Sequence, residues 1–404
     1  MPKGDGMRRI FPWPGLLLLP AICFLSSCAS YNIPASPVVD GQEFVYVQAT
    51  WYTGTGDRSS QSATYGYSVS ANGQLTPLVG YPISGWFVGV ASGRYYFTAD
   101  PDNMHLDTYQ IGADGSFTKI HSVLDQATAH CTDLWCMVRP DLADPKGSSL
   151  YVEVDSYNSG DGAAAPETYS IDKNTGELTF VGQGGADWTF HQGGCSLYDF
   201  SADDRYAYGS CTTYDPGWLD IAVRNPDGSL TEAPHIKVTG PIPPTGIFYS
   251  AEPAGTDSNN HLAAVLTSWD SNWNSLSGAP LRLASYTIHP DGSLTSTNAT
   301  ADMPAVPQLS AVGGLSPSGK LFAAGEQGGV QLFNFNGAAP ITVQGGLIPT
   351  DTPQTMQWDR QNHLFVLSST HKLYVFTVSG SSLVQAPGSP YSIPNAGYFT
   401  VASF

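Results

Sequence analysis

Hairpins of one kind recur seven times along this chain of 404 residues: an alternating strand, a short polar turn and a second strand. They begin at Tyr67, Tyr109, Tyr169, Ala222, Tyr286, Phe333 and Phe376. Their spacing of about 40 to 65 residues fits one four-stranded propeller blade per hairpin. The repeat therefore predicts an all-β fold, a seven-bladed β-propeller that spans residues 41–404.

Four of the hairpin turns place Gly after Asn or Asp: Asn72-Gly73, Asp114-Gly115, Asp227-Gly228 and Asp291-Gly292. Tight hairpin turns need a positive φ, which Gly adopts without strain, so we assign these acidic residues a structural role. The first blade lacks an inner strand, because the chain enters it at residues 44–47, whereas a spare strand at residues 398–404 follows the seventh blade. We expect this C-terminal strand to join the first blade and close the ring.

Composition indicates a folded β-protein and limits its partners. Gly (43) and Pro (30) are abundant, and aromatic residues make up 12% of the chain, whereas charged residues make up only 12%. Disordered chains show the reverse, with many charges and few aromatic residues. The net charge of −18 disfavours nucleic acid and anionic membrane faces as partners. We expect a monomer whose ligand is neutral or cationic.

Residues 1–27 have the layout of a secretory signal, because Arg8-Arg9 precedes an apolar stretch that is too short to span a membrane. The stretch ends in Leu25-Ser26-Ser27-Cys28, which resembles the lipobox of bacterial lipoproteins. The resemblance implies acylation of Cys28, with palmitate among the chains, and several chains give stable anchoring. Ala29 in place of Asp favours the outer membrane of the cell envelope, with residues 28–40 as a tether. The alternative is an ordinary signal peptide with an incidental Cys.

Four further cysteines follow, and an even number in an exported protein indicates disulfides. Cys195 and Cys211 flank a tight turn at residues 202–205, so we expect them to face each other across a hairpin and form a bridge. Cys131 and Cys136 would then pair by elimination. No Cys or His spacing is typical of a zinc site, so we expect neither a metal nor a cofactor.

Three segments carry a resemblance to a known family. These are Ser316-Pro-Ser-Gly-Lys320 before Leu-Phe, and the strand ends at residues 75–80 and 384–391. They resemble the seven-bladed lactonase-like propellers, which include 6-phosphogluconolactonases and YVTN-repeat surface proteins, over about residues 40–404. In catalytic members the resemblance implies His, Arg and Glu side chains around the channel mouth and no metal. The stretch that matches their Pro-His-x-His segment is Ala129-His130-Cys131-Thr132-Asp133.

Two sets of loops share one face of a propeller: those between second and third strands, and those that link successive blades. Seven tryptophans fall in or beside these loops: Trp51, Trp86, Trp135, Trp188, Trp218, Trp269 and Trp273. Their flat rings, with carboxylates nearby, suit carbohydrate or a cationic group. The alternative is that these rings fill gaps between blades.

Two successive blade connections also carry His130, Asp133, Asp187 and His191. Such a cluster could act as the general base that opens a lactone, although solvated loop residues are the simpler interpretation. We therefore expect a lipid-anchored envelope protein whose binding face takes carbohydrate or an envelope protein. A lactonase-like hydrolase of sugar lactones is the alternative.

Overall fold

The computed structural model describes residues 41–52, 60–85, 88–100, 105–125, 136–156, 164–184, 195–211, 219–233, 236–272, 274, 276, 278–380 and 382–404. All of them belong to the second of the two units into which the chain divides, Ala35–Phe404. The predicted signal peptide, the tether and Cys28 lie outside the described residues. None of the helices in the described ranges has the length and apolarity needed to cross a membrane.

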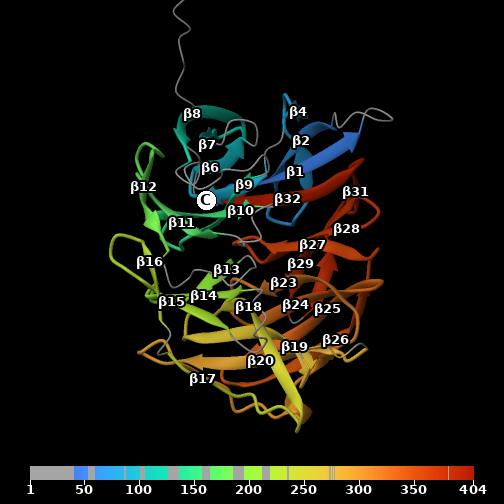
Figure 1. Ribbon diagram of the computed structural model, residues 1–404. Coiled ribbons are helices and arrows are strands. Elements are labelled where there is room, and N and C mark those ends of the chain that lie inside the picture. Colours follow the sequence, from blue (N-terminus) through green and yellow to red (C-terminus); the bar gives the residue numbers. More distant parts are fainter. Residues whose placement is uncertain are drawn as a thin grey trace, which may run out of the picture. The chain divides into compact units, whose positions relative to one another are not determined.

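Seven sheets follow one another along the chain, as the hairpin repeat predicts, and we number these blades I to VII (Figure 1). Their strands pair antiparallel, except that the short β17 (Val238–Thr239) of blade V pairs in parallel with β21 (Leu294–Thr295). Blade II consists of β5 (Gly89–Ser92), β6 (Tyr95–Asp100), β7 (His105–Ile111) and β8 (Phe117–Leu124). Blade III consists of β9 (Cys136–Ala143), β10 (Ser149–Ser156), β11 (Ala164–Ile171) and β12 (Leu178–Gln183). Blade IV consists of β13 (Cys195–Phe200), β14 (Tyr206–Cys211), β15 (Asp220–Arg224) and β16 (Leu230–Glu232). Blade VI consists of β23 (Leu309–Leu315), β24 (Leu321–Glu326), β25 (Gly329–Asn336) and β26 (Ala339–Pro349).

Blades V and VII add short strands to the same plan. Blade V has β18 (Ile247–Thr256), β19 (His261–Asp270), β20 (Leu281–Ile288) and β21 (Leu294–Thr295), with β17 (Val238–Thr239) beside β21 and β22 (Ala305–Val306) beside β20. A single 3-10 turn, η2 (Thr300–Asp302), precedes β22. Blade VII has β27 (Pro353–Trp358), β28 (His363–Ser368), β29 (Lys372–Ser379) and β30 (Ser382–Gln385), with β31 (Tyr391–Ser392) beside β29.

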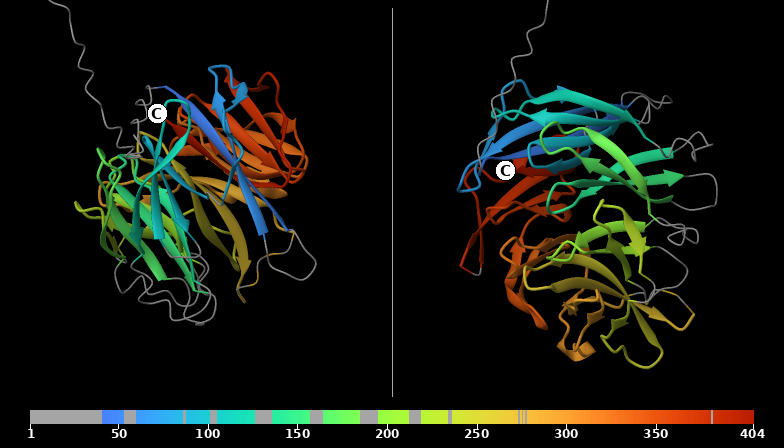
Figure 2. Two further views of the ribbon diagram at one scale, coloured as in Figure 1. Left: turned by 90° about the horizontal axis from the view of Figure 1, so that it is seen from above. Right: turned by 90° about the vertical axis from the view of Figure 1, so that its left-hand side faces the viewer.

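Blade I is assembled from both ends of the described chain. It contains β1 (Glu43–Tyr52), β2 (Ser60–Val69) and β3 (Leu75–Pro77), with β4 (Ile83–Ser84) beside β2, and its inner strand is β32 (Ala396–Ser403). The β1–β32 register places Val45 opposite Val401 and Val47 opposite Phe399. The red β32 therefore lies against the blue β1, and this junction is visible in both views of Figure 2. The predicted closure by the C-terminal strand is confirmed.

The inner strands form a closed ring around the channel. Each contacts the next, in the order β32, β5, β9, β13, β18, β23, β27 and back to β32. Each pair of neighbouring blades also has its own cluster of buried apolar side chains; between blades VII and I, for example, Phe365 and Leu367 pack with Val47 and Phe399. Burying both faces of every sheet in this way makes the hydrophobic effect, about 25 cal/mol per Å², the main force that holds the blades together.

The predicted hairpin turns have the expected geometry. Gly73, Gly115, Gly228 and Gly292 all have positive φ, between 77° and 93°. Asp114 shows the role of the acidic residues, because its Oδ1 accepts hydrogen bonds from the backbone N–H of Ser116 (3.0 Å) and from its hydroxyl (2.6 Å). A Cβ at Gly115 would also lie only 2.9 Å from the Phe44 ring. These turns therefore need Gly both for conformation and for space.

Polar side chains connect several blades to their neighbours. In blades I, II and VII, a residue with a positive φ precedes the start of the second strand, and the side chain that follows it reaches the turn between third and fourth strands of the next blade. Three such contacts run from Gln42 Nε2 to Ala113 O (2.9 Å), from Arg94 Nη2 to Asn174 O and from His363 Nε2 to Ala71 O (3.3 Å). The side chain at this position therefore contributes to blade docking.

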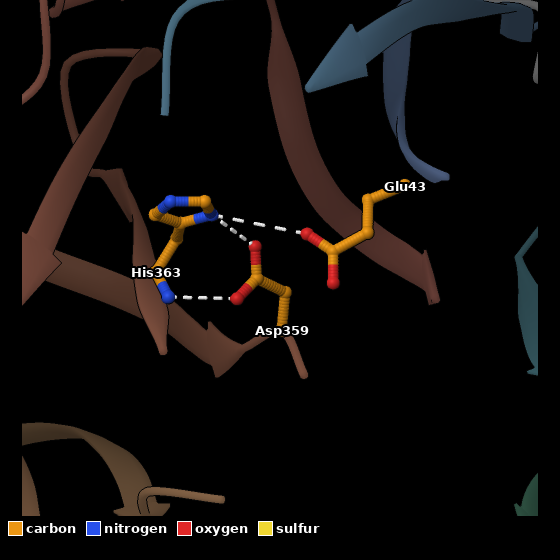
Figure 3. A group of neighbouring side chains, drawn as sticks. All are labelled: Glu43, Asp359 and His363. Carbon is orange, nitrogen blue, oxygen red and sulfur yellow. Dashed lines mark hydrogen bonds and ion pairs between the residues drawn. The ribbon is translucent and has the colours of Figure 1, made fainter. Parts of the chain in front are cut away.

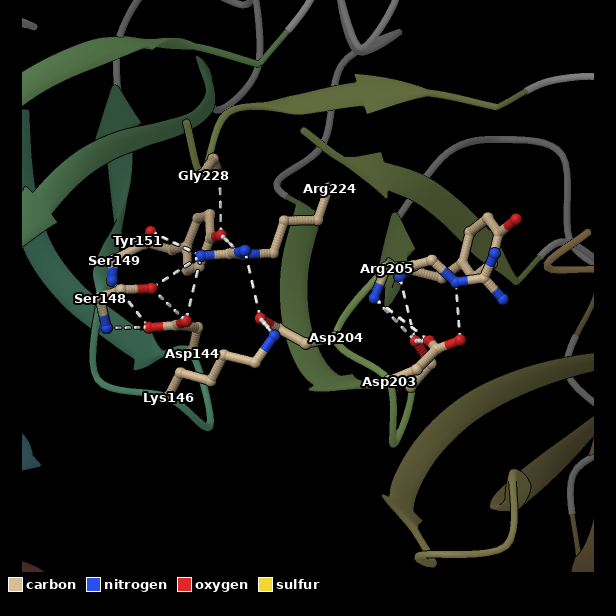
Figure 4. Close-up of polar contacts among 12 residues, drawn as sticks. Asp144, Lys146, Ser148, Ser149, Tyr151, Asp203, Asp204, Arg205, Arg224 and Gly228 are labelled. Carbon is tan, nitrogen blue, oxygen red and sulfur yellow. Dashed lines mark hydrogen bonds and ion pairs between the residues drawn. The ribbon is translucent and has the colours of Figure 1, made fainter. Parts of the chain in front are cut away.

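Arg224 connects blades III and IV more strongly (Figure 4). Its guanidinium lies 3.0 Å from Asp144 Oδ2 and 3.1 Å from Asp204 Oδ2, and Nε donates to the Tyr151 hydroxyl at 3.0 Å. Lys146 Nζ lies 3.1 Å from the same oxygen of Asp204. Every carboxylate in this network therefore has a cation within ion-pair distance.

Candidate functional site

A cavity of about 890 Å³ lies at the end of the channel where the inner strands begin. Ser310, Gln354 and Tyr398 are early residues of β23, β27 and β32, so three inner strands deliver side chains to it. The remaining lining residues are Gln48 and Thr50 of β1, Thr355 of β27, Ala396 and Gly397 at the start of β32, and two loop residues, His371 and Asn395. This is the end at which the loops between second and third strands, and those between blades, also lie.

The lining of this cavity is polar and includes no Asp, Glu, Lys or Arg. It consists of amides, hydroxyls, a phenol and an imidazole, together with backbone at Ala396 and Gly397. Gln48 Oε1 accepts a hydrogen bond from Thr64 Oγ1 at 3.0 Å, which fixes the direction of its amide. Groups of this kind both donate and accept hydrogen bonds, which is what a neutral polyhydroxyl ligand requires.

His371 is held in an unusual conformation at this cavity. Its φ is 60°, in the left-handed region that Gly or Asn usually occupies, and Asn395 in the same lining has φ 59°. His371 Nδ1 lies 2.8 Å from the carbonyl oxygen of Ala396. A carbonyl only accepts, so Nδ1 carries the hydrogen, and in the neutral ring Nε2 is left as an acceptor. The turn thus orients an imidazole whose second nitrogen is free to bind.

Tyr398 supplies the aromatic surface of the cavity. It lies opposite Gln48 in the β1–β32 register and is 38% exposed. Burial raises the pKa of its phenol, and the negative charge of Asp141 adds to the shift, whereas a hydrogen bond with Thr400 opposes it. The hydroxyl therefore stays protonated at neutral pH and can donate or accept a hydrogen bond.

The opposite end of the channel has a different chemistry. A second cavity, of about 540 Å³, lies where β13, β18, β23 and β27 end, and Asp199, Glu252, Met356 and Trp358 are among its lining residues. Burial raises the pKa of Asp199 to about 6, although hydrogen bonds from the backbone N–H groups of Phe200 and Thr256 lower it. Burial also raises the pKa of Glu252. This end of the channel is acidic, whereas the other end is neutral.

Most site residues predicted from the sequence lie outside the described residues. This holds for His130, Asp133, Asp187 and His191, for Cys131, and for Trp86, Trp135, Trp188, Trp218 and Trp273. Trp51 lies in β1, but its side chain is outside the described part. Trp269 is described: it lies near the end of β19, and its indole N–H donates to Ser250 Oγ on β18 at 2.8 Å.

The cysteine predictions fall on strands whose backbone alone is described. Cys195 and Cys211 are direct partners in the β13–β14 register, and Cys136 is the first residue of β9. Opposed residues of an antiparallel pair have Cα atoms about 4.5 to 5.5 Å apart, within the range that a disulfide bridges. The register therefore supports the Cys195–Cys211 bridge, which stays a prediction together with Cys131–Cys136.

A buried polar cluster lies in the seam between blades VII and I (Figure 3). Glu43 at the start of β1 is 2% exposed, and Asp359 and His363, at the turn from β27 into β28, are 2% and 3% exposed. Asp359 Oδ1 accepts hydrogen bonds from the backbone N–H groups of Gln361 (2.9 Å) and His363 (2.7 Å), while Oδ2 lies 2.5 Å from His363 Nδ1. Burial raises the pKa of Glu43. Burial lowers the pKa of His363, but the hydrogen bond with Asp359 and the nearby carboxylate of Glu43 outweigh it and raise the pKa overall.

Sequence reasoning identified neither the neutral cavity nor this cluster. The lining residues are spread over β1, β23, β27 and β32, and none belongs to a motif. One signal was available: His371 occupies a tight-turn position at which Gly or Asn is usual, which indicates a role beyond the turn. Glu43 and Asp359 come from opposite ends of the propeller sequence, so no local spacing connects them.

These features define the class: the chain is a seven-bladed β-propeller with a ligand-sized cavity at the mouth of its channel. No protein-family model and no curated protein matches its sequence. Solved structures do match. One is a protein from Lactobacillus plantarum, 14% identical, with a TM-score of 0.56, covering 89% of this chain and 99% of that one. Another is a hypothetical selenium-binding protein from Sulfolobus tokodaii, 11% identical, with a TM-score of 0.54, covering 91% and 95%.

At such low identity, the likeness to these structures shows the fold alone. The propeller class is therefore supported both by the sheet topology and by the comparisons. The resemblance to lactonase-like propellers and the lipoprotein signal stay predictions.

Proposed function

We propose that this protein is a binding module of the bacterial cell envelope that holds a neutral glycan at the channel mouth where the inner strands begin. The observation that carries the proposal is the cavity of about 890 Å³ with its uncharged polar lining. Sugars present hydroxyls that donate and accept at once, and the amides of Gln48 and Gln354 and the imidazole of His371 offer both functions. The half-exposed ring of Tyr398 offers a face on which a pyranose can stack.

The anchoring part of the proposal rests on the sequence. Acylation of Cys28 would attach the propeller to the outer membrane through residues 28–40. The tryptophan-bearing loops, which the sequence predicts at this end of the channel, would widen the apolar surface of the cavity. A lipid-anchored propeller of this kind would present the cavity to envelope glycans or to a glycan-bearing envelope protein.

The test is glycan binding by the full chain in detergent, first on an array and then by calorimetry with the best glycan. His371→Asn keeps a residue that tolerates the left-handed conformation, so the fold should be retained. It shortens the polar group that reaches the ligand, and we expect affinity to fall about tenfold, the equivalent of about 1.4 kcal/mol. Glu252→Gln, which alters the cavity at the other end of the channel, is the matched control and should bind normally.

Two results would overturn this proposal. One is that the wild-type protein binds no glycan; the other is that Glu252→Gln weakens binding while His371→Asn does not. The same preparations should be assayed with sugar lactones. Turnover by the wild-type protein that His130→Ala abolishes would replace the binding proposal with the lactonase alternative.

A further inference from the structure

We propose that Glu43, Asp359 and His363 form a binding site for one divalent transition-metal ion, Zn²⁺ foremost, which holds the ring of blades closed. The three residues come from β1 and from the turn that leads into β28, so the ion would connect blade I to blade VII (Figure 3). Within the described part of the chain, this is the one group of three such side chains whose donor atoms all lie within 4.8 Å of one another.

Glu43 provides the observation that points to a ligand. Its Oε2 is buried and has no hydrogen-bond partner, and His363 Nδ1 lies 3.8 Å away, beyond hydrogen-bond distance. A buried carboxylate oxygen without a partner is costly, so a structure that retains it needs a compensating group. A cation between Glu43, Asp359 and His363 would be that group.

The orientation of His363 fits a metal ligand. Its Nε2 lies 3.3 Å from the carbonyl oxygen of Ala71, which can only accept, so Nε2 carries a hydrogen. Metal-binding histidines commonly donate their second ring N–H to a carbonyl or carboxylate in this way, which fixes the ring and points the other nitrogen at the ion. Here that other nitrogen is Nδ1, and it faces both carboxylates.

The distances are close to those of a coordination sphere. Ligand atoms about 2.0 Å from a tetrahedral ion lie about 3.3 Å from each other. The two contacts of His363 Nδ1, 2.5 Å to Asp359 and 3.8 Å to Glu43, fall on either side of that value. Small shifts of these side chains would bring the two His363 contacts to that spacing, and the ion would replace the proton that Nδ1 shares with Asp359.

Charge and ligand type favour a transition metal. Two carboxylates and a neutral imidazole carry a charge of −2, which a divalent ion balances inside a buried site. An imidazole nitrogen beside two carboxylates suits Zn²⁺, Mn²⁺ or Fe²⁺, whereas Ca²⁺ and Mg²⁺ take oxygen ligands. Because the ligands meet only when blades I and VII dock, binding of the ion would stabilise the closed ring.

Blade V provides an internal comparison for this inference. Asp257 and His261 repeat the Asp-x-x-Asn-His pattern of Asp359 and His363, and His261 Nδ1 lies 2.9 Å from Asp257 Oδ2. Among the described residues, no third carboxylate lies close enough to that pair to complete a similar group. The Asp–His pair is thus a general turn feature of this chain, and Glu43 is what distinguishes the seam.

The test is metal content and thermal stability of the full chain in detergent. After treatment with a chelator, the wild-type protein should take up one equivalent of Zn²⁺, measured by elemental analysis, and its melting temperature should rise with Zn²⁺ concentration. Glu43→Gln keeps the size of the side chain and removes a ligand. We expect it to fold, to bind Zn²⁺ at least tenfold more weakly and to show no rise in melting temperature.

His261→Gln is the matched control, because it alters the twin motif in blade V and should leave Zn²⁺ uptake unchanged. Uptake by Glu43→Gln equal to that of the wild type would mean adventitious surface binding and would overturn the inference. It would also be overturned if the wild type responded to none of Zn²⁺, Mn²⁺ and Fe²⁺, or responded to Ca²⁺ alone. His363→Gln gives a second, independent loss of a ligand if Glu43→Gln fails to fold.

Discussion

Buried carboxylates meet at several blade interfaces in the described part of this propeller, and two of these clusters neutralise them with different partners. Between blades VII and I, Glu43 and Asp359 face the imidazole of His363. Between blades II and III, the Tyr169 hydroxyl lies 2.8 Å from Glu167 Oε2 and 3.2 Å from Asp125 Oδ2. Both glutamates have raised pKa values, so in both places burial opposes the charged form.

The partner decides how the negative charge is neutralised. An imidazole can carry a positive charge or bind a metal ion, so the seam cluster can keep its carboxylates ionised. A phenol stays neutral and supplies a single hydrogen for two carboxyl groups. Burial, and then the charge of Asp125, raises the pKa of Glu167 to about 7, so this second cluster retains a proton on Glu167 into the neutral range. The difference shows that one fold neutralises buried acids by a cation in one interface and by a proton in another.

The largest expected effect comes from removing the anionic partner of His363. Asp359→Asn keeps an oxygen for the turn but leaves a buried imidazolium without its closest partner, and we expect a loss of about 3 to 5 kcal/mol in the free energy of unfolding. The equivalent change in blade V, Asp257→Asn, should cost less, about 1 kcal/mol, because His261 is partly exposed to water. Urea unfolding of both variants in the presence of chelator measures the difference. Equal losses would contradict the distinct role of the seam.

Glu167→Gln should change the stability of the protein in a pH-dependent way, which distinguishes this cluster from the seam cluster. The folded pKa of Glu167, about 7, exceeds its unfolded value of 4.5, so the folded state binds more protons and stability falls as pH rises through this interval. The side chain of Gln does not titrate, so the variant should not lose stability as pH rises through this interval. We expect a gain on the order of 2 to 3 kcal/mol at about pH 8 and almost none at about pH 4.

Thermal melting across this pH range checks the prediction, with Glu177→Gln, in the turn before β12, as an exposed control. A gain of the same size at both ends of the range would show that the proton on Glu167 is not the cause.

The smallest expected effect comes from Tyr169→Phe. It removes the hydroxyl that both carboxyl groups share, and losing such a hydrogen bond costs about 1 to 2 kcal/mol. The loss should be greater at about pH 8, where Glu167 is ionised, than at about pH 5, where the protonated carboxyl can donate to Asp125. Urea midpoints at the two pH values measure it. A loss that does not depend on pH would assign Tyr169 a packing role only.

The repeat, the tight turns and the ring closure could be predicted from the sequence because each depends on local pattern. Asn-Gly and Asp-Gly dipeptides determine turn geometry, and a spare strand at the end of the chain has one place to pair. The seam cluster could not be predicted, because Glu43 meets Asp359 only after seven blades have closed. The Asp-His pair alone occurs in blade V as well, so the motif does not identify the site.

The neutral cavity escaped prediction for a similar reason. Gln354 and Ser310 are ordinary polar residues at the starts of strands, and only the ring arrangement brings them together with Tyr398. The aromatic loops predicted from the sequence favoured this end of the channel, whereas the described cavity is built from amides and hydroxyls. His371 was the one residue whose local context was unusual enough to indicate a role.

The position of β32 also determines at what stage of synthesis and folding the edge of β1 is covered. All the other described strands are synthesised before this eight-residue strand, which must then pair with β1, the first of them along the chain. Until it does, β1 presents a row of unpaired backbone groups to any neighbouring chain. Pairing between such distant segments is also slow. Proteolytic removal of β32 would therefore leave the edge of β1 open to pairing with other chains. The resistance of the propeller to aggregation thus depends on β32.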